Sequence, residues 1–95
     1  MGSKTTRVRN MTSPSSGREI ANQFIIEDGA DTCFQSYNTI IAKVERNEDE
    51  TRVYLDPAWD CSVTTGKYRN KFLRENKKET EAKIKDGIYI VTNLN

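Results

Sequence analysis

The spacing of apolar residues changes twice along this chain, from every second residue to every third or fourth and back again. Between residues 20 and 56 apolar side chains alternate with polar ones, as in half-buried strands. Tyr68 and Phe72 then lie one helical turn apart, and residues 88–91 alternate again. The pattern predicts the order β-β-β-β-α-α-β. This is a two-layer α+β domain, with two helices inserted before the last strand of a mostly antiparallel sheet of about five strands. A small, curved, barrel-like sheet with a helical insert is the alternative.

Turn-forming residues separate the expected strands, which span residues 20–26, 33–37, 39–45 and 51–56. Asp28-Gly29 is typical of a hairpin turn. Residues 47–50 are polar and are expected to form a loop. Pro57 ends the fourth strand, because proline cannot donate a ladder hydrogen bond.

Polar residues mark the ends of both helices. Ser62, Thr64 and Thr65 can each cap the first helix, because a hydroxyl oxygen accepts a hydrogen bond from a free backbone N–H group. Asn76 and Glu79 have the spacing of a capping box, and Gly87 is suited to end the second helix. A second hypothesis is that the N–H groups near Ser62, Thr64 and Thr65 bind an anion such as phosphate. Capping is the preferred interpretation.

A chain of 95 residues supports one domain at most. Residues 1–18 hold few apolar side chains, and residues 13–17 have the composition of a loop or linker. We therefore expect a flexible basic tail over residues 1–18 and a single domain over residues 19–95. Residues 1–3 resemble the remnant of a cloning site. Phe34 and Trp59 are expected inside the core, since a small domain needs its large apolar side chains buried.

The sequence lacks the residues on which much enzyme chemistry depends. It has no histidine, which excludes Ser-His-Asp and Cys-His arrangements, and only two cysteines, too few for a zinc site. Cys33 and Cys61 are expected to be reduced, although one bridge between them stays open. Thr64-Thr65-Gly66-Lys67 lacks the remaining residues of a phosphate-binding loop. We therefore expect a protein that is not an enzyme and holds no metal or cofactor.

Charge is unevenly distributed, although the net charge is only +1. Residues 20–60 carry nine acidic and three basic side chains, whereas residues 61–95 carry four acidic and eight basic ones. Lys67, Lys71, Arg74 and Lys78 would form one ridge if they shared a helix, and Asn76 would interrupt it. The candidate contacts for nucleic acid or a protein partner are Lys67, Arg69, Lys71, Arg74, Lys78, Arg52 and Tyr54. A solvated helix face is the preferred interpretation of the ridge, and a phosphate-binding surface is the alternative.

Two motifs carry a resemblance to a known family. They are FQSYNTIIAKV at residues 34–44 and WDCSVTTGKYRNKFL at residues 59–73. With these motifs the chain is similar to a family of small, functionally uncharacterised bacteriophage proteins. The resemblance implies a phage or prophage accessory protein in the cytoplasm of the bacterial host. It implies no catalytic or binding residue.

Two functions remain as hypotheses. The first is a non-enzymatic accessory protein that binds a host protein and so inhibits or modulates a host or host-defence activity. Opposed acidic and basic zones suit such docking. The alternative is a small nucleic-acid-binding module that uses the basic helix face and the basic N-terminal tail. No membrane partner is expected, because the longest apolar run, at residues 88–91, is too short to span a bilayer.

Overall fold

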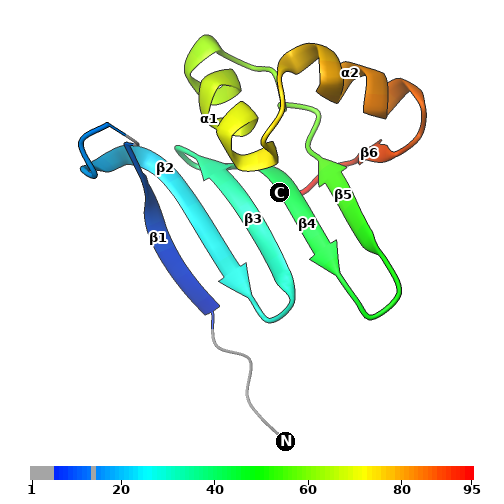
Figure 1. The fold of residues 1–95 in the computed structure, drawn as a ribbon, viewed down its shortest axis with the longest axis horizontal. Coiled ribbons are helices and arrows are strands. Elements are labelled where there is room, and N and C mark those ends of the chain that lie inside the picture. The colour runs from blue at the N-terminus through cyan, green and yellow to red at the C-terminus, as the bar shows by residue number, and fades with distance from the viewer. Residues whose placement is uncertain (1–5, 14) are drawn as a thin grey trace, which may run out of the picture.

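A single sheet with two helices over one end of it forms the fold (Figure 1). The computed structural model describes residues 6–13 and 15–95. The elements follow one another as β1 (Thr6–Thr12), β2 (Glu19–Asp28), β3 (Asp31–Ser36), β4 (Thr39–Arg46), β5 (Thr51–Leu55), α1 (Val63–Leu73), α2 (Lys77–Lys85) and β6 (Tyr89–Val91). The strands lie in the sheet in the same order as in the sequence.

The connections between strands decide their directions. Short loops join β1 to β2 and each later strand up to β5, so these neighbours are antiparallel. The two helices carry the chain back across the sheet before β6, which therefore pairs parallel to β5. The predicted α+β fold, with two helices before the last strand of a mostly antiparallel sheet, is confirmed. Among the described residues the sheet is open, with β1 and β6 at its edges, so it is not a closed barrel.

The sixth strand is β1, which lies within the segment predicted to be a flexible tail. It pairs with β2 through a register that places Val8 beside Ile26, and Met11 packs against the core. Arg9 of β1 also forms an ion pair with Glu27 of β2. The prediction of a tail over residues 1–18 is therefore wrong for residues 6–12, because long-range pairing stabilises a segment that has few apolar residues. Residues 1–5, including the proposed cloning remnant, lie outside the described residues.

The helix ends follow the predicted capping. Ser62 caps α1, because its Oγ accepts a hydrogen bond from the Thr65 N–H at 3.1 Å. Asn76 and Glu79 form a reciprocal capping box at the start of α2. Gly87 follows α2 with a φ angle of +75°, a conformation that glycine adopts without steric strain. These local predictions are confirmed.

The core lies between the helices and the sheet. Its buried members are Phe34, Ile41, Ala42, Leu55 and Tyr89. Phe72 of α1 stacks on Phe34 with ring centroids 5.8 Å apart, and Tyr68 also packs against the core, so the predicted helical stripe is confirmed. Trp59, predicted to be inside, is half-buried against this core. The helices cover one end of the sheet, and the strands continue beyond them (Figure 1).

Candidate functional site

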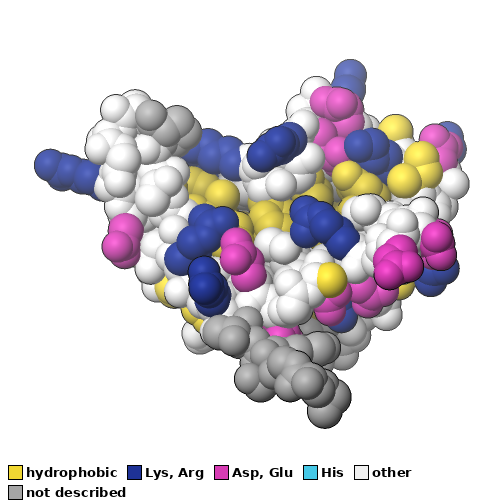
Figure 2. All heavy atoms as spheres, turned by 60° about the horizontal axis from the view of Figure 1, so that its bottom comes forward, with side chains coloured by type: hydrophobic (Ala, Val, Ile, Leu, Met, Phe, Trp, Pro, Cys, Tyr) yellow, Lys and Arg dark blue, Asp and Glu magenta, His cyan; other side chains and the backbone are white. Residues whose placement is uncertain are grey.

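A groove lies on the face of the sheet that carries the helices, at the C-terminal end of α1. It encloses about 570 Å³. Its lining consists of Arg9, Ile25, Glu27, Thr32, Val44, Arg46, Val53, Phe72, Leu73, Arg74 and Tyr89. We call it the arginine groove, because three arginines line it around a floor that includes the half-buried side chains of Val44 and Val53. Figure 2 shows apolar side chains in the recess of this surface, with basic side chains around them.

The floor of the arginine groove is built by the register of the sheet. Thr32 pairs with Val44, Val44 with Val53, and Val53 with Tyr89. Side chains of paired residues point to the same face, so the four form a continuous row across β3, β4, β5 and β6. Val44 and Val53 are only half-buried, which leaves apolar surface facing the groove.

Two arginines of the rim come from strands. Arg9 of β1 lies 3.3 Å from a carboxylate oxygen of Glu27. Arg46, at the end of β4, donates a hydrogen bond to the Thr32 Oγ1 at 3.0 Å. Within the described part of the chain, Arg46 has no acidic side chain within 4.0 Å. Arg46 is exposed, so a carboxylate of another molecule can reach its guanidinium.

The third rim arginine, Arg74, caps the C-terminal end of α1 in a left-handed conformation. Its φ and ψ angles are 58° and 44°, and its backbone N–H donates to the Asn70 carbonyl oxygen. Glycine is the usual residue there, since the left-handed region costs other residues about 1–2 kcal/mol. Arg74 is exposed and, like Arg46, forms no ion pair with a described residue. The fold thus holds a strained arginine at the mouth of the groove.

The predicted basic ridge does not form, because α1 ends before Arg74. Lys67 and Lys71 lie on α1, Arg74 lines the arginine groove, and Lys78 lies exposed on α2. The interruption near Asn76 that the sequence indicated is present, since Asn76 caps a separate helix. The four cations are consequently divided among three places.

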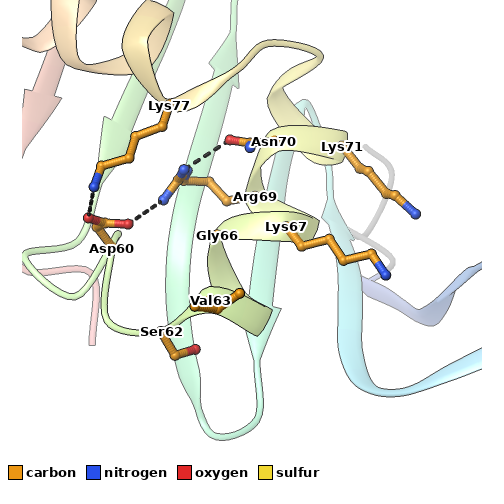
Figure 3. A pocket seen from close by; sticks show the side chains of 9 residues that line it. All are labelled: Asp60, Ser62, Val63, Gly66, Lys67, Arg69, Asn70, Lys71 and Lys77. Atoms are coloured by element: carbon orange, nitrogen blue, oxygen red, sulfur yellow. Dashed lines mark hydrogen bonds and ion pairs between the residues drawn. The ribbon is translucent and has the colours of Figure 1, made fainter.

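Lys67 and Lys71 remain together, and we call them the lysine pair. Their ammonium nitrogens lie 5.4 Å and 5.3 Å from the centre of the Tyr68 ring, and neither forms an ion pair with a described residue. A shallow hollow of about 830 Å³ runs along this helix. Figure 3 shows the two lysines extending on one side of α1, away from Asp60. Two such unpaired cations can attract an anion.

Arg69, also predicted to be a contact, is not available at the surface. It is 1% exposed, and its Nη1 donates to the Trp59 carbonyl oxygen at 2.8 Å. The same nitrogen lies 3.3 Å from Asp60, and Nη2 donates to the Asn70 Oδ1 at 2.9 Å (Figure 3). Arg69 therefore connects α1 to the loop after β5. The sequence could not separate it from its exposed neighbours, because burial depends on that loop.

The remaining strand candidates lie on the other face of the sheet. Arg52 and Tyr54 alternate with Val53, which faces the arginine groove. Arg52 is exposed, and its Nε donates to a Glu50 carboxylate oxygen at 2.7 Å. Arg52 and Tyr54 therefore belong neither to the arginine groove nor to the surface around the lysine pair.

The hydroxyl residues at the start of α1 have separate environments. Ser62 accepts the capping hydrogen bond, and Thr65 is 2% exposed and shares a hydrogen bond of 2.9 Å with Ser36. Thr64 is exposed. Capping thus accounts for Ser62, and burial in the core accounts for Thr65.

A buried carboxylate, Glu75, lies between the two helices, with its side chain 3% exposed. Burial raises its pKa, but hydrogen bonds from Lys83, Thr80 and Tyr89 outweigh this effect, so the pKa lies below its ordinary value. The bonds from Lys83 and Tyr89 to Oε1 measure 2.6 Å and 2.8 Å. This network connects β6 to the segment between the two helices and gives both carboxylate oxygens of Glu75 a hydrogen-bond partner.

The remaining titratable groups show no assembled metal site. No group of three or more histidine, cysteine, aspartate or glutamate residues among the described residues could hold a metal ion. Cys33 is half-buried, with a pKa raised mainly by burial, and Cys61 is exposed; both are free thiols. No helix in residues 6–13 and 15–95 is long and apolar enough to cross a membrane.

Sequence reasoning missed two of the three arginines in the groove. The sequence analysis places Arg9 in the tail and leaves Arg46 without a site, between the strand expected over residues 39–45 and the loop expected over residues 47–50. The alternation of Val44 and Arg46 places both on one face of β4, which was the available signal. Only the pairing of β4 with β3 and β5 shows that this face is the floor of a groove.

These features define the class of the protein as a small α+β domain with an arginine-rimmed groove beside its helices. The chain belongs to a family of unknown function, DUF8033, whose model matches residues 6–88. The matched region begins with β1, in agreement with a domain that includes this strand. Neither the curated proteins nor the solved structures contain a match to the chain.

Proposed function

We propose that this protein acts by binding another protein and does not catalyse a reaction. The observation that carries the proposal is the arginine groove, where the half-buried valines Val44 and Val53 adjoin two arginines that form no ion pair with a described residue. Exposed apolar surface with a polar rim is typical of interaction sites. Arginine is also enriched in such sites, because it combines apolar contact with charge.

The resemblance to small bacteriophage proteins supplies the biological context of the proposal. A phage accessory protein in the bacterial cytoplasm would meet host enzymes and host-defence proteins there. Occupying a surface of such a protein is sufficient to inhibit or modulate it, and requires no cofactor. We therefore propose a host protein as the partner.

Site-specific photo-crosslinking tests this proposal. A benzophenone amino acid at Thr51, which is exposed and pairs with Arg46 at the border of the groove, would report on a bound partner. The matched position is Val8, which is 62% exposed and faces the other side of the sheet. In bacterial lysate we expect one discrete protein adduct from position 51, none from position 8, and loss of the adduct in the R46E/R74E variant. The same adduct from both positions, or none from position 51, would contradict the proposal.

Nucleic-acid binding is a second candidate function, and the lysine pair favours it. Lys67 and Lys71 form no ion pair with a described residue and lie beside Tyr68, an arrangement that can bind phosphate oxygens beside an aromatic ring. Fluorescence anisotropy with single- and double-stranded oligonucleotides, over about 50–200 mM salt, tests it. Salt-dependent binding that is lost in K67E/K71E but kept in R46E/R74E would establish this function. Absence of binding at low salt would remove it.

A further inference from the structure

We propose that the arginine groove binds an amphipathic helix of the partner protein, with carboxylate side chains on either side of the helix's apolar face. This inference rests on the proposed function and specifies the partner segment. It follows from three properties of the groove: its saturated backbone, its charge and its apolar floor.

Three of the four strands that form the floor have no free hydrogen-bonding edge, and only β6 lies at an edge of the sheet. Strands β3, β4 and β5 each pair with a neighbour on both sides. An extended segment lying on this face would therefore bury N–H and C=O groups without partners, which is unfavourable. A helix satisfies its own backbone groups and presents only side chains to the floor. The saturated floor thus favours a helical ligand.

The charge of the groove requires acidic residues on that helix. Three arginines and one glutamate line it, and Glu27 is already paired with Arg9. Arg46 and Arg74 remain without ion pairs to described residues. Arginine binds carboxylates through two parallel hydrogen bonds, so Arg46 and Arg74 would match acidic side chains that flank the apolar face of the ligand.

The apolar surface of the groove favours protein side chains over nucleobases. Val44, Val53 and Leu73 are aliphatic and half-buried, which suits leucine-like side chains at helical spacing. The two aromatic residues are engaged elsewhere. The Phe72 ring stacks on Phe34, and the Tyr89 hydroxyl donates to Glu75. Base-stacking platforms need accessible aromatic faces, whereas Phe34 covers one face of Phe72 and Tyr89 is only 8% exposed.

The test uses stapled helical peptides of about 15 residues as probes. One peptide carries leucine at helical positions i, i+3, i+4 and i+7, flanked by glutamates, and its matched control carries lysines instead of the glutamates. Each is titrated into the full chain, with fluorescence anisotropy for affinity and nuclear magnetic resonance for the binding position. We expect the acidic peptide to bind at least about tenfold more tightly than the basic one. The chemical-shift changes on binding should be largest at the amide groups of Val44, Val53 and Leu73.

Two charge-reversal variants locate the interaction. R46E/R74E should weaken binding of the acidic peptide at least about tenfold. K67E/K71E changes the net charge by the same amount as R46E/R74E, but it alters the outer side of α1 and not the groove. This variant should bind the acidic peptide as tightly as the wild type does. Equal losses in both variants would indicate a general charge effect and overturn the inference. The comparison of the two peptides on the wild-type protein remains decisive even if a variant fails to fold.

Other outcomes would also overturn the inference. These are equal binding of both peptides, no binding of either, displacement of the acidic peptide by a single-stranded oligonucleotide, and a groove filled by a second copy of the chain in sedimentation experiments. If crosslinking at Thr51 captures a protein through a segment that is not an acidic helix, the proposed function stands and this inference fails. If neither experiment shows binding, both fail.

Discussion

The guanidinium of Arg69 lies 5.0 Å from the centre of the Trp59 ring and donates a hydrogen bond to the Trp59 carbonyl oxygen. One side chain of α1 thereby contacts both the side chain and the backbone of the loop that follows β5. A buried cation is favourable only when most of its donors are paired, and here Nη1 and Nη2 donate to three acceptors, while Nε has no partner among the described residues. Arg69 therefore has a structural role in holding α1 on the sheet.

We predict that Arg69→Ala lowers the free energy of unfolding by about 3 kcal/mol. It would leave the Trp59 carbonyl oxygen without its partner and remove the cation beside the indole ring. The free energy of unfolding of Arg69→Lys should lie between those of the wild type and Arg69→Ala. A single ammonium group cannot reach three acceptors in the fork geometry of a guanidinium. Urea denaturation followed by Trp59 fluorescence measures both. A loss below about 0.5 kcal/mol for the alanine variant would show that Arg69 is dispensable.

Stability should fall in acid, with Glu75 as one source. Its pKa in the folded protein lies below the ordinary value of 4.5, so the ionised carboxylate favours the folded state. This contribution is complete above the ordinary value and is lost as the pH falls through the folded-state pKa. Glu75→Gln should lower the free energy of unfolding at neutral pH by about 1–3 kcal/mol and flatten its decrease between about pH 5 and pH 3.

Urea denaturation across that pH range checks the role of Glu75. The pKa values of Asp56 and Asp60 are also lowered by hydrogen bonds, so a smaller acid dependence should remain in the variant. Glu81→Gln, at an exposed position of α2, is the control and should follow the wild type. Parallel curves for Glu75→Gln and the wild type would contradict the assignment.

Arg74→Gly should stabilise the protein while weakening the proposed interaction. Glycine adopts the left-handed conformation without the strain that arginine carries, and part of this gain is offset by the greater freedom of glycine in the unfolded chain. We expect a net increase of about 0.5–1 kcal/mol in the free energy of unfolding. Arg74→Ala retains the strain and should show no increase. Thermal denaturation and the acidic-peptide titration measure the two effects, and a glycine variant no more stable than the alanine variant would refute the strain argument.

Removing β1 should destabilise the domain. A chain that begins at residue 13 loses the pairing of β1 with β2 and the contact of Met11 with the core. It would also leave the β2 edge open for pairing with other molecules. We expect a lower unfolding midpoint and association in size-exclusion chromatography. A truncated protein that is monomeric and as stable as the full chain would restore the interpretation of this segment as a tail.

Helix caps, helix ends and the alternation of side chains in strands were predictable from short stretches of sequence. The cap at Ser62, the capping box of Asn76 and Glu79, and the helix end at Gly87 each depend on residues within one turn of one another. The alternation within β4 and β5 likewise follows from neighbouring residues. Such features are set by backbone hydrogen bonds and side-chain spacing close along the chain, so they do not depend on the rest of the fold.

The tertiary structure alone decided which of these residues meet. β1 became a strand because β2, on the far side of a turn, supplies its hydrogen bonds. Arg69 became a buried structural residue because the loop around Trp59 closes over it. Arg46 and Arg74, 28 positions apart in the sequence, border one groove because β4 and the end of α1 converge there. The physical reason is that burial and pairing depend on strand register and helix placement, which join residues that no local pattern connects.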